Sequence, residues 1–96
     1  MTKGYWVVSY RSILDTRKLG KYAELASKAI HDSGGRIVVR GVPAATHDEG
    51  ISELAVVVEF ESLDAAMAAR DSEAYQIALA ALTGAVERDF RIVAGS

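Results

Sequence analysis

Apolar and polar residues alternate along this chain with a period that changes between segments, and the changes mark its elements. The segment GYWVVSY, residues 4–10, is rich in aromatic and β-branched residues and is followed by a polar Arg-Ser pair, which is typical of a strand. From Asp15 to Ser33 apolar residues recur at spacings of three and four, which predicts an amphipathic helix. Their positions are Leu19, Tyr22, Ala23, Ala26 and Ile30. Gly34 and Gly35 follow as a helix stop.

The rest of the pattern predicts two strands, two helical segments and a last strand. RIVVRG (36–41) and ELAVVVEF (53–60) have the composition of strands, and the polar loop between them contains the only proline, so they should form a hairpin. Ser62 and Ser72 are suited to cap the N-termini of two successive helical segments, the second of which ends at a glycine. RDFRIVAG (88–95) completes the pattern as a strand.

The predicted order is therefore strand, helix, strand, strand, helix, strand. Two right-handed strand-helix-strand units joined by a central hairpin give a four-stranded antiparallel sheet with the helices on one face. The predicted fold class is α+β, with the ferredoxin-like βαββαβ arrangement.

Alternation within the strands predicts what lies on the sheet face that the helices leave uncovered. Successive side chains point to opposite faces of a strand, and Val56, Val58 and Phe60 form the more apolar set, which belongs under the helices. The opposite face then mixes valines with charged and polar residues: Arg36, Val38, Arg40, Val57 and Glu59, joined by Tyr5, Val7, Ser9, Arg11, Asp89, Arg91 and Val93. A patch of this kind usually marks an interface, so we expect a homodimer through the sheet face. Its charged groups should either pair or line an enclosed cavity, because unpaired buried charge is too costly.

Length and composition restrict the class of protein. With 96 residues the chain can build one hydrophobic core, so residues 1–96 are expected to form a single domain. The formal net charge of −2 does not provide the basic field that nucleic-acid binding requires. The chain has no cysteine, no signal-peptide pattern and no apolar window long enough to span a membrane. We therefore expect a cytoplasmic protein with neither nucleic-acid nor membrane partners.

Several short motifs occur in a characteristic order along the chain. They are KGYW at the start, GGRIVVRG after the first helix, VVVEFES before the second, SEAYQ inside it and DFRIVAG at the end. From Lys3 to Gly95 the chain resembles the bacterial family called domain of unknown function 1330, within the dimeric α+β barrel superfamily. The resemblance implies a homodimer in which two four-stranded sheets form a barrel. Members of that family commonly carry an arginine where this chain has Leu82, so a family site that used this arginine would be altered here.

Arg36 and Arg40 are the first candidates for a ligand site. They lie roughly 13 Å apart at about 3.3 Å rise per residue, so they could contact opposite ends of a ligand but could not clamp one carboxylate together. The alternative is that each pairs with a neighbouring acid such as Glu59. Glu59 itself could serve as a general base inside a barrel, although an adjacent arginine favours a structural ion pair. Ser9 shares the predicted face, and Tyr75 is a candidate because it belongs to a motif of the resemblance.

The histidines do not suggest a metal or haem site. Neither His31 nor His47 falls on an inward strand position, and the consecutive residues around His47 would have difficulty converging on one ion. We therefore expect no metal and no cofactor.

Two interpretations of function remain open. The first is a homodimer whose barrel cavity binds a small polar or anionic organic molecule, with cofactor-free isomerase or oxygenase chemistry as an extension. The second is a non-catalytic binding or regulatory module. The superfamily that the resemblance implies includes monooxygenases, isomerases, haem enzymes and regulatory proteins, so it does not select one chemistry.

Overall fold

The elements follow one another along the chain in the predicted order. The structure is a computed structural model that describes residues 2–96. Its elements are β1 (Gly4–Ile13), α1 (Thr16–Asp32), β2 (Arg36–Gly41), β3 (Ala55–Phe60), α2 (Leu63–Asp71), α3 (Glu73–Leu82) and β4 (Val86–Ala94). β1 runs past its predicted end at Tyr10, because Ser12 and Ile13 still pair with β4 beyond a register shift.

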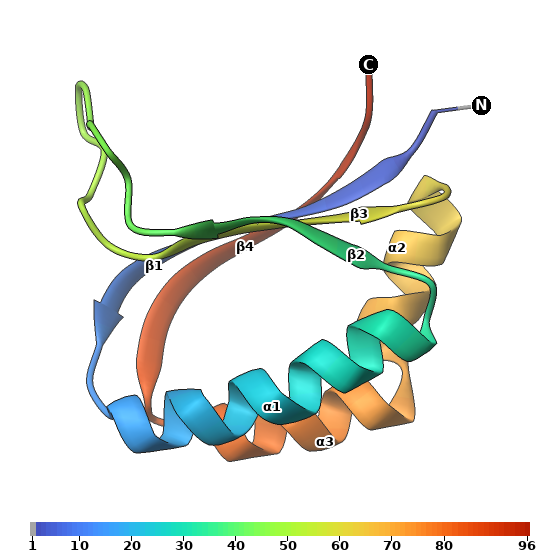
Figure 1. Ribbon diagram of the computed structural model, residues 1–96, viewed down its shortest axis with the longest axis horizontal. Helices are drawn as coiled ribbons and strands as arrows, with labels where there is room; N and C mark the ends of the chain where they lie inside the picture. The colour runs from blue at the N-terminus through green and yellow to red at the C-terminus, as the bar shows by residue number, and fades with distance from the viewer. Residues whose placement is uncertain (1) are drawn as a thin grey trace.

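The four strands form one antiparallel sheet in the order β2-β3-β1-β4. All three helices lie on the same side of this sheet, and the loop between β2 and β3 rises on the other side together with the start of β1 and the end of β4 (Figure 1). The predicted ferredoxin-like arrangement, with helices on one face only, is therefore confirmed. We call the two sides of the sheet the helix face and the open face.

Polar side chains begin each helix. The carboxylate of Asp15 accepts hydrogen bonds from the backbone N–H groups of Arg17 and Lys18 at the start of α1. The predicted caps are confirmed, since the hydroxyl of Ser62 accepts from the backbone of α2 and that of Ser72 from the backbone of α3. Because Ser72 both ends α2 and begins α3, the chain turns there, so that α3 runs alongside α1 beneath the sheet (Figure 1).

An aromatic cluster forms the centre of the core on the helix face. The ring of Trp6 lies 4.9 Å from that of Phe60, 4.8 Å from that of Tyr75 and 5.2 Å from that of Phe90. Its Nε1 donates a 2.8 Å hydrogen bond to the carbonyl of Ala66 in α2, so the buried indole has its partner. Phe60 is 1% exposed, which confirms the predicted parity of β3.

β2 contains a bulge at Val38. Ile37 pairs with Val58, but the next paired residue is Val39, which lies opposite Val57. Two residues of β2 therefore oppose one residue of β3, and the alternation of side chains shifts by one position from Val39 onward.

The bulge turns Arg40 toward the helix face. Arg40 pairs with Val56, which packs against the core, whereas Arg36 precedes the bulge and pairs with Glu59 on the open face. The prediction that Arg36 and Arg40 share one face is therefore wrong. It assumed one-to-one pairing along the whole of β2, and a single extra residue reverses every later position.

Candidate functional site

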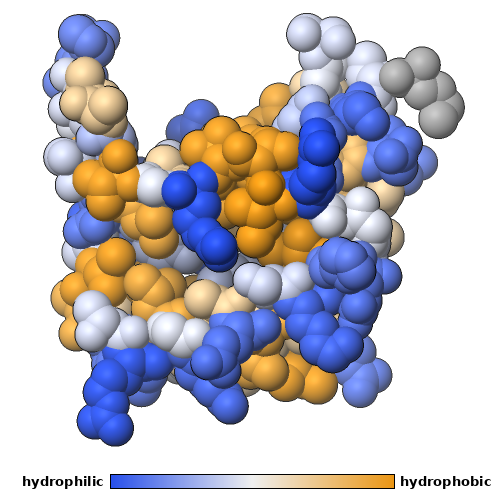
Figure 2. Space-filling view, in the orientation of Figure 1, coloured by the Kyte–Doolittle hydropathy of each residue, from blue (hydrophilic) through white to orange (hydrophobic). Residues whose placement is uncertain are grey.

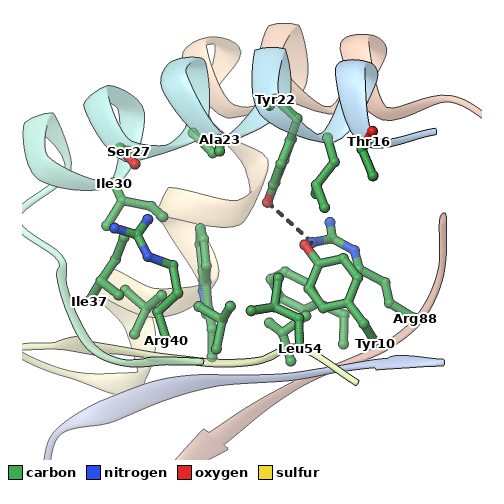
Figure 3. A pocket seen from close by; sticks show the side chains of 18 residues that line it. Tyr10, Thr16, Tyr22, Ala23, Ser27, Ile30, Ile37, Arg40, Leu54 and Arg88 are labelled. Atoms are coloured by element: carbon green, nitrogen blue, oxygen red, sulfur yellow. Dashed lines mark hydrogen bonds between the residues drawn. The ribbon is translucent and has the colours of Figure 1, made fainter. Parts of the chain in front are cut away.

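A cavity of about 390 Å³ lies between α1 and the helix face of the sheet (Figure 3). Along α1 its wall includes Gly20, Ala23, Ala26 and Ser27, whose side chains are too small to fill the space between helix and sheet. The sheet side is lined mainly by apolar residues: Trp6, Val8, Ile37, Leu54, Val56, Val58 and Phe90. The volume falls within the range of roughly 300–1,000 Å³ that is usual for small-molecule sites.

A cluster of one arginine and three tyrosines closes one end of this cavity. Arg88 of β4 donates from Nη1 to the hydroxyls of Tyr10 (3.1 Å) and Tyr22 (3.2 Å), and from Nη2 to the hydroxyl of Tyr75 (3.3 Å). The hydroxyls of Tyr22 and Tyr75 also hydrogen-bond each other. Tyr10, Tyr22 and Arg88 converge at one side of the cavity in Figure 3, while Tyr75 is 1% exposed and does not line it. We call these residues the Arg88 cluster.

The Arg88 cluster has more hydrogen-bond donors than acceptors. Within residues 2–96, no carboxylate oxygen lies within 4.0 Å of the half-buried Arg88 guanidinium. Of the three hydroxyl protons, only the one between Tyr22 and Tyr75 has a protein acceptor among the described residues. The rings of Tyr10 and Tyr22 lie 5.6 and 5.1 Å from the guanidinium carbon and offset part of its charge. The surplus of positive charge and of donors remains, and it favours an anion.

Burial keeps Tyr10 and Tyr22 in their donor form. It raises the pKa of Tyr22 well above the ordinary value and raises that of Tyr10 as well. Burial alone would lower the pKa of Arg88, but attraction to the oxygens of Tyr22 and Tyr75 outweighs it, and the net pKa lies above the ordinary value. At neutral pH the cluster therefore presents a charged guanidinium and the protonated hydroxyls of Tyr10 and Tyr22.

Arg40 lies at the opposite end of the same cavity (Figure 3). Its side chain is exposed, and the described part of the chain offers its guanidinium neither an ion pair nor a hydrogen bond. The arginines of the open face differ in this respect, since Arg36 pairs with Glu59, and both Arg91 and Arg11 lie within 4.0 Å of Asp89.

The other predicted site residues lie on the open face. Arg36 Nη2 is 3.1 Å from Glu59 Oε1, and the hydroxyl of Tyr5 donates to Glu59 Oε2 at 3.0 Å. The hydrogen bond from Tyr5, together with the charge of Arg36, holds the pKa of Glu59 below its usual range, so this carboxylate is ionised and paired. The expected structural ion pair is confirmed. Ser9 is exposed on the same face, opposite Ala55.

Sequence reasoning missed the residues that close the cavity, although the pattern contained a signal for two of them. Arg88 shares the parity of Phe90, which was placed on the helix face, and Tyr10 shares the parity of Trp6. Tyr22 was assigned only to the apolar stripe of the first helix. Tyr75 was proposed for its motif, and the structure puts it in the Arg88 cluster, behind the cavity.

Metal ligands and membrane-spanning helices are the two other features to consider in the described residues. Within residues 2–96, no three His, Cys, Asp or Glu side chains come together as metal ligands. His31 lies 3.7 Å from Asp32 on the surface of α1, and His47 is exposed in the loop after β2. Among the helices that the structure describes, none is both long and apolar enough to cross a membrane.

Several solved structures share this fold at low sequence identity. A protein of unknown function from Rhodopseudomonas palustris is 12% identical, with 96% of this chain and 81% of that chain covered and a TM-score of 0.72. A dimeric ferredoxin-like protein of unknown function from Thermobifida fusca is 16% identical over 97% and 91% of the two chains, with a TM-score of 0.65. A protein from Caulobacter crescentus with the name "putative antibiotic biosynthesis monooxygenase" is 12% identical over 99% and 90%, with a TM-score of 0.60.

Sequence comparison gives a more specific result than these structures, whose likeness establishes the fold alone. No curated protein sequence matches the chain significantly. The family model described as Domain of unknown function (DUF1330) matches residues 3–96, in agreement with the motifs noted above. The protein therefore belongs to the DUF1330 family.

Proposed function

We propose that this protein binds a small organic anion in the cavity between α1 and the sheet, with the anionic group held by the Arg88 cluster. One observation carries the proposal. Arg88 is half-buried beside an apolar cavity and has no carboxylate partner within residues 2–96. The proposal puts the ligand inside each protomer. The sequence analysis instead predicts a ligand between the two sheets of a dimer.

The surroundings of Arg88 would strengthen its interaction with an anion. Apolar walls exclude water and lower the local dielectric constant, so a charge-assisted hydrogen bond gains strength there. The hydroxyls of Tyr10 and Tyr22 line the cavity, and their protons can be donated to the same anionic group. The apolar remainder of the wall suits the hydrocarbon part of an organic acid.

Binding without turnover is the function that the lining supports best. The residues that line the cavity include protonated tyrosines and arginines, but the described lining contains no aspartate, glutamate or histidine that could accept a proton. The same donors would also stabilise an enolate, so cofactor-free isomerase or oxygenase chemistry is the second candidate. Deuterium exchange from solvent into a bound acid, or oxygen uptake, would distinguish the two.

The open face supports the proposal of a homodimer, since Figure 2 shows a hydrophobic patch on this side of the sheet, flanked by hydrophilic side chains. Val39 is 48% exposed, Val93 45% and Val7 36%, and all three lie on this face between ion-paired residues. Burying these valines against a second copy would remove apolar surface from water while the charged groups stay paired. The T. fusca neighbour is described as dimeric, which agrees with this arrangement.

The anion site can be tested by calorimetric titration with small carboxylic acids and with their uncharged amides. We expect the acid to bind and the amide not to. Replacing Tyr10 or Tyr22 by phenylalanine removes one donor to a charged group, which is worth about 1.5–3 kcal/mol, and should weaken binding roughly ten- to hundredfold. Tyr5→Phe is the matched control, because its hydroxyl donates to Glu59 on the open face. Equal binding of acid and amide, or equal losses in Tyr5→Phe and Tyr10→Phe, would refute the site.

A further inference from the structure

Two arginines without carboxylate partners enter one cavity from opposite ends. Arg88 belongs to the edge strand β4 and Arg40 to the opposite edge strand β2. In Figure 3 their guanidinium groups lie at the two sides of the cavity, with Leu54 between them and Ile37 beside Arg40. The proposed function uses Arg88 and leaves Arg40 without a role.

The local structure of β2 gives Arg40 this position. Without the bulge at Val38, Arg40 would share the open face with Arg36, where acidic partners are available. Bulges are commonly found where a strand must re-aim a side chain near a functional site. The bulge instead directs a cation to the rim of an apolar cavity, where no acid within residues 2–96 pairs with it.

The register of the sheet sets the separation of the two arginines. Arg40 aligns through Val56 and Val8 with Phe90, two residues from Arg88 on β4. Three strand spacings of about 4.8 Å and an offset of two residues at about 3.3 Å each place the two Cα atoms roughly 16 Å apart. Their guanidinium groups lie at opposite sides of the cavity (Figure 3), so one carboxylate would not contact both, and an apolar stretch of the cavity lies between them.

We infer that the ligand is an elongated diacid, with one carboxylate on the Arg88 cluster, the other on Arg40 and a hydrocarbon spacer along the apolar wall. This inference rests on the proposed function, since it adds a second contact to the same site. The cavity volume of about 390 Å³ corresponds to roughly a dozen water-sized volumes at about 30 Å³ each, which suits an unbranched diacid of about six to eight carbons.

Calorimetric titrations with straight-chain dicarboxylates of increasing length, each paired with the monocarboxylate of equal carbon number, test the inference. For the wild type we expect an optimum of chain length, at which the diacid binds at least tenfold more tightly than its monoacid. Arg40→Gln should remove this advantage and leave the affinity for the monoacid within about twofold. Arg40→Lys should retain only part of the advantage, because an ammonium group cannot replace a bidentate guanidinium.

Arg36→Gln is the matched control, since it removes the same charge from the same strand but on the open face. We expect it to leave the preference for the diacid unchanged. Equal affinities of the wild type for diacid and monoacid would overturn the inference that the ligand is a diacid. Equal losses of diacid affinity in Arg40→Gln and Arg36→Gln would overturn it as well, and either result would leave the Arg88 site intact. Failure of every carboxylate to bind would instead overturn the proposed function as well.

Discussion

Gly4 lies where the start of β1 meets the start of α2, and we expect its replacement by alanine to destabilise the fold strongly. A Cβ atom at this position would lie 2.7 Å from Leu63 Cα and 2.8 Å from Leu63 N, and it would also overlap the carbonyl oxygen of Ser62. All of these atoms belong to the backbone, so no side-chain rotation can relieve the overlap. Overpacking costs about 1–3 kcal/mol, and we expect the upper half of that range here.

Gly20 provides a control with the same chemical change and the opposite expected sign. It lies within α1, and a Cβ atom added there would meet no atom within 4 Å. Alanine favours a helix over glycine by about 0.5–1 kcal/mol, so Gly20→Ala should stabilise the protein.

Thermal unfolding, followed by circular dichroism at equal protein concentrations and without ligand, measures both effects. A change of 1 kcal/mol shifts the melting temperature of a domain this size by about 4–8 °C. Gly4→Ala should therefore melt roughly 10–20 °C below the wild type and Gly20→Ala a few degrees above it. A melting temperature of Gly4→Ala equal to or above that of the wild type would show that β1 and α2 do not approach each other as described.

Two further predictions concern assembly and pH. Val57→Asp should place an unpaired charge in the proposed interface and convert the dimer to a monomer in sedimentation velocity runs, whereas a wild type that is monomeric at micromolar concentration would contradict the interface. The folded-state pKa of Glu59 lies below its ordinary value of 4.5, so the stability that it contributes is present above that pH and is lost as the pH falls through the lowered pKa. The folded-state pKa of Tyr22 lies above 10.0, so its contribution is present below that pH and is lost as the pH rises toward the raised pKa. The free energy of unfolding, measured with urea across the pH range, should therefore fall less steeply at acid pH in Glu59→Gln and less steeply at alkaline pH in Tyr22→Phe. Slopes unchanged from those of the wild type would contradict these assignments.

The sequence by itself determined the order of the elements and the faces of most strands. Helix and strand periodicities are local properties, and the caps at Ser62 and Ser72 act on the backbone of the next turn, so neither depends on distant residues. The same locality explains why the parity of β3, with Phe60 under the helices, could be predicted without any structure. The pairing of Arg36 with Glu59 followed from that parity together with the hairpin.

Tertiary structure alone decided where the cavity lies and which side chains enter it. A bulge is defined by how a strand pairs with its neighbour. The pattern within RIVVRG therefore does not indicate that Val38 is the extra residue or that Arg40 changes face. The cavity exists because the small side chains of α1 face the sheet without filling the space between helix and sheet. The size of that space depends on the position of α1, which packs against α3. The Arg88 cluster draws its members from β1, α1, α3 and β4, and only the packing of these elements brings one guanidinium and three hydroxyls within hydrogen-bonding distance.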